Sequence, residues 1–260
     1  MPGRLPTQAD FHSATVSIIP PPPTHNPTNV LLLLHGLGDT QLNFASFAGK
    51  LALPETCCIA LRAPAPLPFD LEGYHWGDDI VFDNATGGLD ADSGFKKALN
   101  LVLENIVRRI LIGKCGYKGR EIIFFGFGQG GMLALSLAKE MEIDELGGVV
   151  SVGGALPASM ALATEGKKSK TPVVICKASN NSAVKDKDVQ RLRDSFEFLE
   201  LNEWKRNGDG MPEAQKRERR TQRKRGTFLR KRNQQSTAHL KSSKFRHRFF
   251  YMEVEQILAA

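Results

Sequence analysis

The sequence lacks the features that mark secreted, membrane-spanning and metal-binding proteins. It has four cysteines, none of them in a Cys-x-x-Cys pair, so neither a disulfide framework nor a zinc site is indicated. The first residues contain no apolar core of a signal peptide. The most apolar run, Val30–Leu34, is far too short to cross a bilayer. We therefore expect a cytosolic or nuclear protein with no transmembrane segment, and we expect neither a metal nor a cofactor.

Acidic residues are nearly missing from one part of the chain. Between Ala214 and Arg248 the single acid is Glu218, against fourteen lysines and arginines. This segment carries a formal charge of +13 and the whole chain carries +7, so the remainder carries −6. The composition thus predicts a proline-rich lead-in (1–29), an α/β domain (30–212) and a basic tail (213–260) that is disordered.

The basic tail has three interpretations. A charge run without apolar periodicity is most often a solvated, disordered segment. The alternative is a nuclear-targeting or non-specific nucleic-acid-binding arm that neutralises phosphates. A third interpretation is that a splicing or reading-frame change has replaced a different C-terminus.

Short apolar runs alternate with helical patterns through the middle of the chain. Unbroken runs of β-branched and aromatic residues are typical of strands that are buried on both faces. The expected strands are 30–34, 57–61, 122–125, 146–152 and 171–176, and the expected helices are 44–51, 90–114, 132–140 and 185–199. This order predicts the α/β class, with a mostly parallel central sheet and helices on both faces.

The glycine turn at Gly126–Gly130 is the most informative motif. A buried strand, a tight turn and a buried helix form the unit that carries the nucleophile in G-x-S-x-G elbows. Here Gly128 stands at the serine position. Because glycine adopts the strained elbow conformation freely, we expect the turn to persist without its attacking hydroxyl.

The same glycines permit a second interpretation. Gly126, Gly128 and Gly131 also satisfy G-x-G-x-x-G, which binds dinucleotides when it follows a strand and precedes a helix. That site needs an acidic residue at the end of the next strand, about twenty residues on. The next strand ends instead in Gly153–Ala155, so nucleotide binding is the weaker hypothesis.

Several segments together resemble the phospholipase/carboxylesterase family, which contains small cytosolic acyl-protein thioesterases and lysophospholipase-like esterases. They are His35–Thr40, Trp76–Asp78, Gly126–Met132 and Ser151–Pro157. The resemblance covers residues 30–204. It implies an α/β-hydrolase fold that hydrolyses carboxylic esters or thioesters through a Ser-Asp-His triad.

The resemblance also assigns the three triad positions, and all three are vacated. The nucleophile falls on Gly128 and the acid falls on Asn181. The histidine belongs to a loop near Asn207–Pro212, which contains none.

The remaining site positions are main-chain groups and pocket residues. The oxyanion hole would be formed by the backbone N–H groups of Leu37 and Gln129. Trp76 and Met132 would line the substrate pocket.

These residues predict a weak or inactive pseudo-hydrolase that still binds an acyl ester or thioester. One alternative is an active ester hydrolase with a site rebuilt around His75, as the general base, and Asp78, as a candidate carboxylate base for water. We expect His35 to be structural, with its ring bonded to the backbone. The second alternative is a nucleic-acid-binding or nuclear protein that acts through its basic tail.

Overall fold

The structure is a computed structural model that describes residues 3–23, 27–82, 87–141, 145–160 and 168–211. Our predictions about the basic tail concern residues 213–260, which lie outside this part of the chain. In the described residues, no helix has both the length and the apolar character needed to span a membrane.

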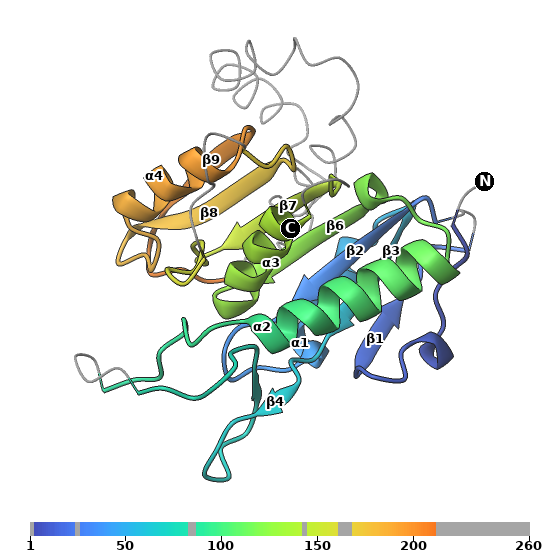
Figure 1. The fold of residues 1–260 in the computed structure, drawn as a ribbon, viewed down its shortest axis with the longest axis horizontal. Helices are drawn as coiled ribbons and strands as arrows, with labels where there is room; N and C mark the ends of the chain where they lie inside the picture. The colour runs from blue at the N-terminus through green and yellow to red at the C-terminus, as the bar shows by residue number, and fades with distance from the viewer. Residues whose placement is uncertain (1–2, 24–26, 83–86, 142–144, 161–167, 212–260) are drawn as a thin grey trace, which may run out of the picture. The chain divides into compact units, whose positions relative to one another are not determined.

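A seven-stranded sheet forms the centre of residues 1–211, in the order β1-β3-β2-β6-β7-β8-β9 (Figure 1). β1 is antiparallel to β3 and every other neighbouring pair is parallel. The strands are β1 (Val16–Ile19), β2 (Asn29–Leu34), β3 (Thr56–Leu61), β6 (Ile122–Phe127), β7 (Gly148–Val152), β8 (Val173–Asn180) and β9 (Leu199–Asn207). The predicted α/β-hydrolase fold, with its mostly parallel sheet, is confirmed.

The strand order reverses between β2 and β6, because the chain moves outward from β2 to β3 and then returns to the other side of β2. Ligands of open α/β sheets bind at such a point, outside the carboxyl ends of the strands. The turn that follows β2 and the elbow that follows β6 both lie there.

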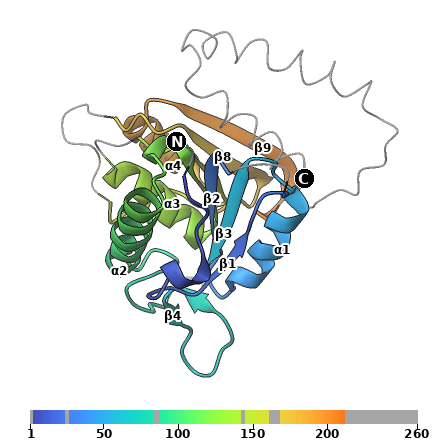
Figure 2. The ribbon, with the colours of Figure 1, turned by 90° about the vertical axis from the view of Figure 1, so that its right-hand side faces the viewer.

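Helices cover both faces of the sheet (Figure 2). α1 (Gln41–Leu51) lies on one side, while α3 (Gln129–Glu140), α4 (Asp186–Ser195) and the long helix lie on the other. The long helix starts as α2 (Lys96–Leu99) and continues as a π-helical stretch, η2 (Asn100–Lys114). Two short 3-10 turns also occur, η1 (Gln8–Asp10) and η3 (Gly119–Glu121).

Neighbouring residues of β6 show how the apolar run serves both faces. Phe124 belongs to the core that includes Val102 and Ile106 of η2. The ring of Phe125 lies 6.3 Å from that of Phe44 and 5.4 Å from that of Phe47, both on α1. Both β6 rings are fully buried, as expected for a central strand with helices on both sides.

The predicted boundary at residue 29 is too late. Val16–Ile19 forms β1 and pairs with Cys58–Leu61 of β3. This strand was missed because the prolines at 20–23 directly follow it, and such prolines are typical of an extended linker. They end β1 at the sheet edge, where the loss of ladder donors costs little.

Two helix predictions also need correction. The helix expected over 90–114 begins at Lys96, and the helix expected to reach Leu199 ends at Ser195. Leu199 instead begins β9, a strand that the sequence analysis did not identify. β9 is an edge strand whose side chains alternate between half-buried and exposed from Glu200 onward, so it has no continuous apolar run.

A small hairpin lies beside the main sheet. Its strands β4 (Ala65–Pro66) and β5 (Tyr74–His75) pair antiparallel. An isolated bridge between Asp39 and Tyr74 joins the hairpin to the turn after β2. The loop expected to line a pocket therefore starts in a short strand next to the carboxyl edge of the sheet.

Candidate active site

The turn after β6 has a strained backbone at Gly128, the position where the resemblance places the nucleophile. Gly128 has φ 50° and ψ −116°, a conformation that costs an ordinary residue of order 1–3 kcal/mol and glycine very little. Its N–H donates to Val152 O at 2.8 Å, and its carbonyl accepts from Met132 N–H at 3.0 Å. α3 begins at the next residue, Gln129.

The glycines around the elbow are required by packing, whereas Gly128 is not. A Cβ on Gly126 would collide with Gly130 O, and a Cβ on Gly130 would collide with Leu34 O. By contrast, a Cβ on Gly128 would meet no atom within 4 Å. Open space therefore exists where a side chain on residue 128 would project.

His35 braces the turn after β2. Its Nδ1–H donates to Gly36 O at 2.7 Å, and its Nε2 accepts from Ala63 N–H at 2.9 Å. Desolvation by burial lowers the pKa of this imidazole, which favours the neutral ring that this pair of hydrogen bonds requires. With both ring nitrogens bonded to the backbone, His35 has a structural role.

Trp76 and Gln129 tie the polar-aromatic loop to the elbow. Trp76 N–H donates to Gln129 Oε1 and Trp76 Nε1–H donates to His35 O, both at 2.8 Å. Gln129 Nε2 donates in turn to Ala91 O at 3.1 Å. Trp76 is fully buried and Met132 is half-buried. Their predicted pocket-lining role stays a prediction, and the geometry gives Trp76 a bracing role.

The two N–H groups expected to form an oxyanion hole lie on adjoining turns. Leu37 follows β2, and Gln129 is the first residue of α3. A Cβ on Gly130 would also collide with His35 O, so these turns are in close contact. Within the described chain, neither N–H donates to another backbone group. Their role as an oxyanion hole stays a prediction.

His75 and Asp78 are not hydrogen-bonded to each other. His75 is 5% exposed, and its Nδ1 has no hydrogen-bond partner among the residues that the structure describes. Burial lowers the pKa of His75. The Asp78 carboxylate accepts from the N–H groups of Lys96 and Lys97 at 2.8 Å each, so it caps the start of α2.

Asp209 occupies the loop where the triad histidine was expected, and the sequence analysis overlooked it. Its Oδ1 accepts from Ala178 N–H at 2.7 Å, and its Oδ2 accepts from Ser182 Oγ at 2.9 Å and Ala183 N–H at 2.8 Å. The signal was an acid between two glycines, directly after a strand. We missed it because the resemblance directed the search to histidine.

Gly128, Asn181 and the loop with Asp209, where the resemblance places the triad, lie along one edge of the sheet. A Cβ on Gly154 would lie 2.5 Å from Gly128 O, and a Cβ on Gly153 would lie 2.7 Å from Asp209 Cβ. Asn181, two residues from the Asp209-bound Ala183, donates from Nδ2 to Asn207 Oδ1 at 2.7 Å. The loops after β6, β7, β8 and β9 therefore meet there. The side groups at these positions are the hydrogen atom of Gly128, the amide of Asn181 and the carboxylate of Asp209, which accepts three hydrogen bonds.

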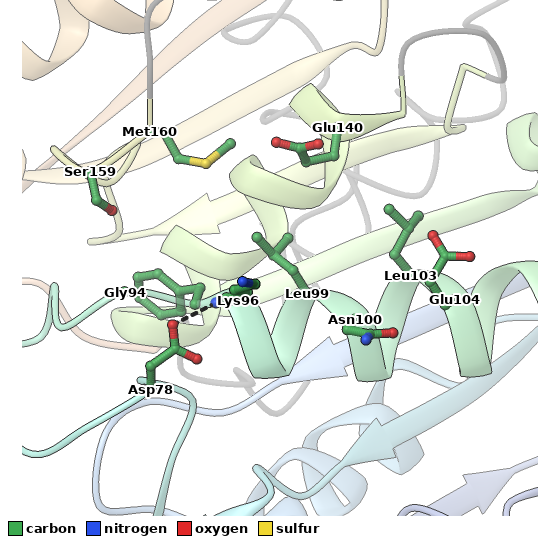
Figure 3. Close-up of a pocket in the computed structure, with 11 residues that line it drawn as sticks. Asp78, Gly94, Lys96, Leu99, Asn100, Leu103, Glu104, Glu140, Ser159 and Met160 are labelled. Atoms are coloured by element: carbon green, nitrogen blue, oxygen red, sulfur yellow. Dashed lines mark hydrogen bonds between the residues drawn. The ribbon is translucent and has the colours of Figure 1, made fainter.

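A groove of about 540 Å³ lies between the long helix, the C-terminal end of α3 and the loop at Ser159 and Met160 (Figure 3). Leu99 and Leu103 project from the long helix toward Met160 and Glu140. Arg191 fixes the loop on the far side, since its guanidinium donates to the carbonyls of Leu156, Pro157 and Met160 at 3.0–3.2 Å. Neither Trp76 nor Met132 lines this groove.

Comparison with known proteins gives the same family from independent directions. The chain is 35% identical over 184 residues to an uncharacterised hydrolase of Schizosaccharomyces pombe, covering 69% of this chain and 74% of that protein. It is 29% identical to acyl-protein thioesterase 1 of Saccharomyces cerevisiae, covering 55% of this chain and 66% of the thioesterase.

Solved structures share the fold at lower identity. Esterase PE8 matches with a TM-score of 0.62 and 20% identity, and Zea mays acyl-protein thioesterase 2 matches with a TM-score of 0.58 and 19% identity. Each match covers 76% of this chain and 92% of the other. The model of the phospholipase/carboxylesterase family matches residues 16–200, and the chain belongs to that family.

Proposed function

We propose that this protein is a pseudo-hydrolase, which binds acyl esters or thioesters at the elbow but has little or no turnover. The observation that carries this proposal is Gly128, which holds the backbone conformation of a nucleophile with open space above it. The N–H groups of Leu37 and Gln129 form the ligand contact in this proposal, because they can donate to a carbonyl oxygen whatever side chains surround them.

The expected residual activity is small. Triad removal leaves only the oxyanion hole and substrate binding, which together give roughly 10³- to 10⁴-fold over water. A hydroxyl at residue 128 would lack a base, since Asp209 is engaged by Ala178, Ser182 and Ala183. One substitution should therefore not restore turnover.

A site rebuilt around His75 is the second candidate, and the unpartnered Nδ1 of His75 favours it. The lowered pKa of His75 keeps the ring neutral near pH 7, as a general base must be. The capping role of Asp78 weakens this candidate. Turnover of short acyl esters that is abolished by His75→Ala would establish it.

The experiment is a hydrolysis assay with p-nitrophenyl esters on four proteins: the wild type, Gly128→Ser, the triple variant G128S/N181D/D209H and His75→Ala. We expect the wild type, Gly128→Ser and His75→Ala to stay near background. The triple variant should exceed Gly128→Ser by at least about tenfold, a small part of what a complete triad supplies. Wild-type turnover well above background would contradict the proposal.

The cytosolic location expected from the sequence also remains a proposal. All four cysteines (Cys57, Cys58, Cys115 and Cys176) are free and buried, which fits a reducing compartment.

A further inference from the structure

β9 forms one edge of the main sheet and is its longest strand. Among the described residues, no strand pairs with its outer side (Figure 1). An unpaired edge presents a row of free N–H and C=O groups, and proteins usually protect such edges from association.

The residues whose backbone groups point outward can be identified from both ends of β9. Phe198 O accepts from Val173 N–H at 2.9 Å, and Gly208 N–H donates to Asn180 O at 2.8 Å. The pairing shifts register between Ala178 and Asn180 of β8, but the alternation of half-buried and exposed residues in β9 is unbroken from Glu200 to Asn207. Because backbone groups alternate sides along a regular strand, even-numbered residues face β8 and odd-numbered residues face outward. The outward residues are Leu199, Leu201, Glu203, Lys205 and Asn207.

The outward residues have an uncommon charge pattern. Glu203 and Lys205 are both exposed and flank Trp204, and Leu201 is 38% exposed. One acid and one base, placed symmetrically about a central residue, become complementary when a strand meets a second copy of itself in the antiparallel direction.

We propose that the outer edge of β9 pairs with the same edge of a second copy of this chain, about a twofold axis at Trp204. Glu203 then lies opposite Lys205 of the partner subunit, and Lys205 lies opposite the partner's Glu203. Both residues point outward, so each opposed pair also exchanges two backbone hydrogen bonds. The contact is isologous and closes at two copies.

Charge selects this register over its neighbours. A twofold axis at Glu203 would place two glutamates opposite each other, and one at Lys205 would place two lysines opposite each other. Like charges directly opposed across strands are destabilising. The same pattern discourages pairing with unrelated strands, so the edge is specific for a second copy.

Trp204 supplies a reporter for this contact. Arg206 stacks on its ring, with Cζ 4.2 Å from the centroid. At the axis, Trp204 directly opposes the partner's Trp204 in a non-hydrogen-bonded pair, in which side chains are close. The other tryptophan, Trp76, is fully buried. A change of tryptophan fluorescence with protein concentration therefore reports mainly on Trp204.

The test is sedimentation equilibrium of the nuclease-treated full chain over roughly 1–200 μM, a range suited to an interface smaller than standard size. The variants are Glu203→Lys, Lys205→Glu and the swap E203K/K205E. All change exposed side chains, so folding should be unaffected. We expect a monomer–dimer equilibrium in the wild type, weakened at least about tenfold by each single reversal and recovered by the swap.

Each other outcome overturns the proposal. A wild type that stays monomeric over the whole concentration range would show that the dimer does not form. A dimer insensitive to the single reversals, or one that the swap does not recover, places the contact elsewhere. As a check on backbone pairing, Glu203→Pro removes an N–H that points away from β8. It should abolish the dimer while thermal unfolding still shows a folded chain, and a persistent dimer would contradict the edge contact.

Discussion

The hydroxyl of Ser182 donates a 2.9 Å hydrogen bond to the carboxylate of Asp209, which joins the loop after β8 to the loop after β9. The same carboxylate accepts two backbone N–H groups, from Ala178 and Ala183. The resemblance to the family places the triad acid on the first of these loops and the triad histidine on the second. In this protein the Asp209 carboxylate holds the two loops together by accepting these three hydrogen bonds.

Replacing Asp209 should destabilise the fold. Asp209→Asn presents an amide NH₂ to at least one of the three donors, so a donor is left unpaired and the free energy of unfolding should fall by about 1–3 kcal/mol. Urea denaturation measures this change. Asp70→Asn is the matched control, because Asp70 lies exposed in a turn. An equal effect of the two variants would show that the Asp209 contacts contribute nothing.

Alanine should have opposite effects at two glycines. Gly153 has φ 65°, and a Cβ there would lie 2.7 Å from Asp209 Cβ, so Gly153→Ala should lower stability by at least about 1 kcal/mol. Gly49 lies exposed in α1, where an added Cβ meets nothing within 4 Å. Gly49→Ala should therefore raise stability by about 0.5–1 kcal/mol. Thermal unfolding of both variants decides, and a tolerated Gly153→Ala would contradict the described packing.

Acid should destabilise the protein through His35. Its folded-state pKa is lowered by burial, whereas the unfolded chain binds a proton near the ordinary value of about 6.5. The stabilisation is therefore complete above that pH and is lost as the pH falls toward the folded-state pKa. The slope is at most about 1.4 kcal/mol per pH unit for one proton.

Urea midpoints between pH 7.5 and 5.5 measure this dependence. His35→Gln should flatten the profile, while His12→Gln, at an exposed position, should leave it unchanged. An unchanged profile in His35→Gln would assign the acid sensitivity to other groups, of which His75 is the first candidate because burial lowers its pKa as well.

The sequence predicts the centre of the fold better than its edges. β2 and β6 are unbroken apolar runs, because helices cover both of their faces, and such runs identify buried strands. β1 and β9 lie at the two edges. β1 was obscured by the prolines that end it, and the exposed Glu203 and Lys205 gave β9 the composition of a loop.

At the candidate site, the sequence predicts the backbone of the turn better than the contacts of the side chains. The elbow could be predicted because close packing at Gly126 and Gly130 requires glycine, so the residue types alone indicate the tight turn. The sequence marks Asp209 only as an acid between two glycines, and its contacts could not be predicted because the three donors are 26 to 31 residues away in the chain. Only the parallel pairing of β8 with β9 brings them together.

The most direct test of the central claim is intact-mass spectrometry of the wild-type protein after incubation with a fluorophosphonate or an activated acyl ester, before and after digestion. We predict an unmodified mass, with no adduct on residues 121–139, because Gly128 carries no atom that can attack a carbonyl. A stoichiometric acyl or phosphonyl adduct near this turn would contradict the account.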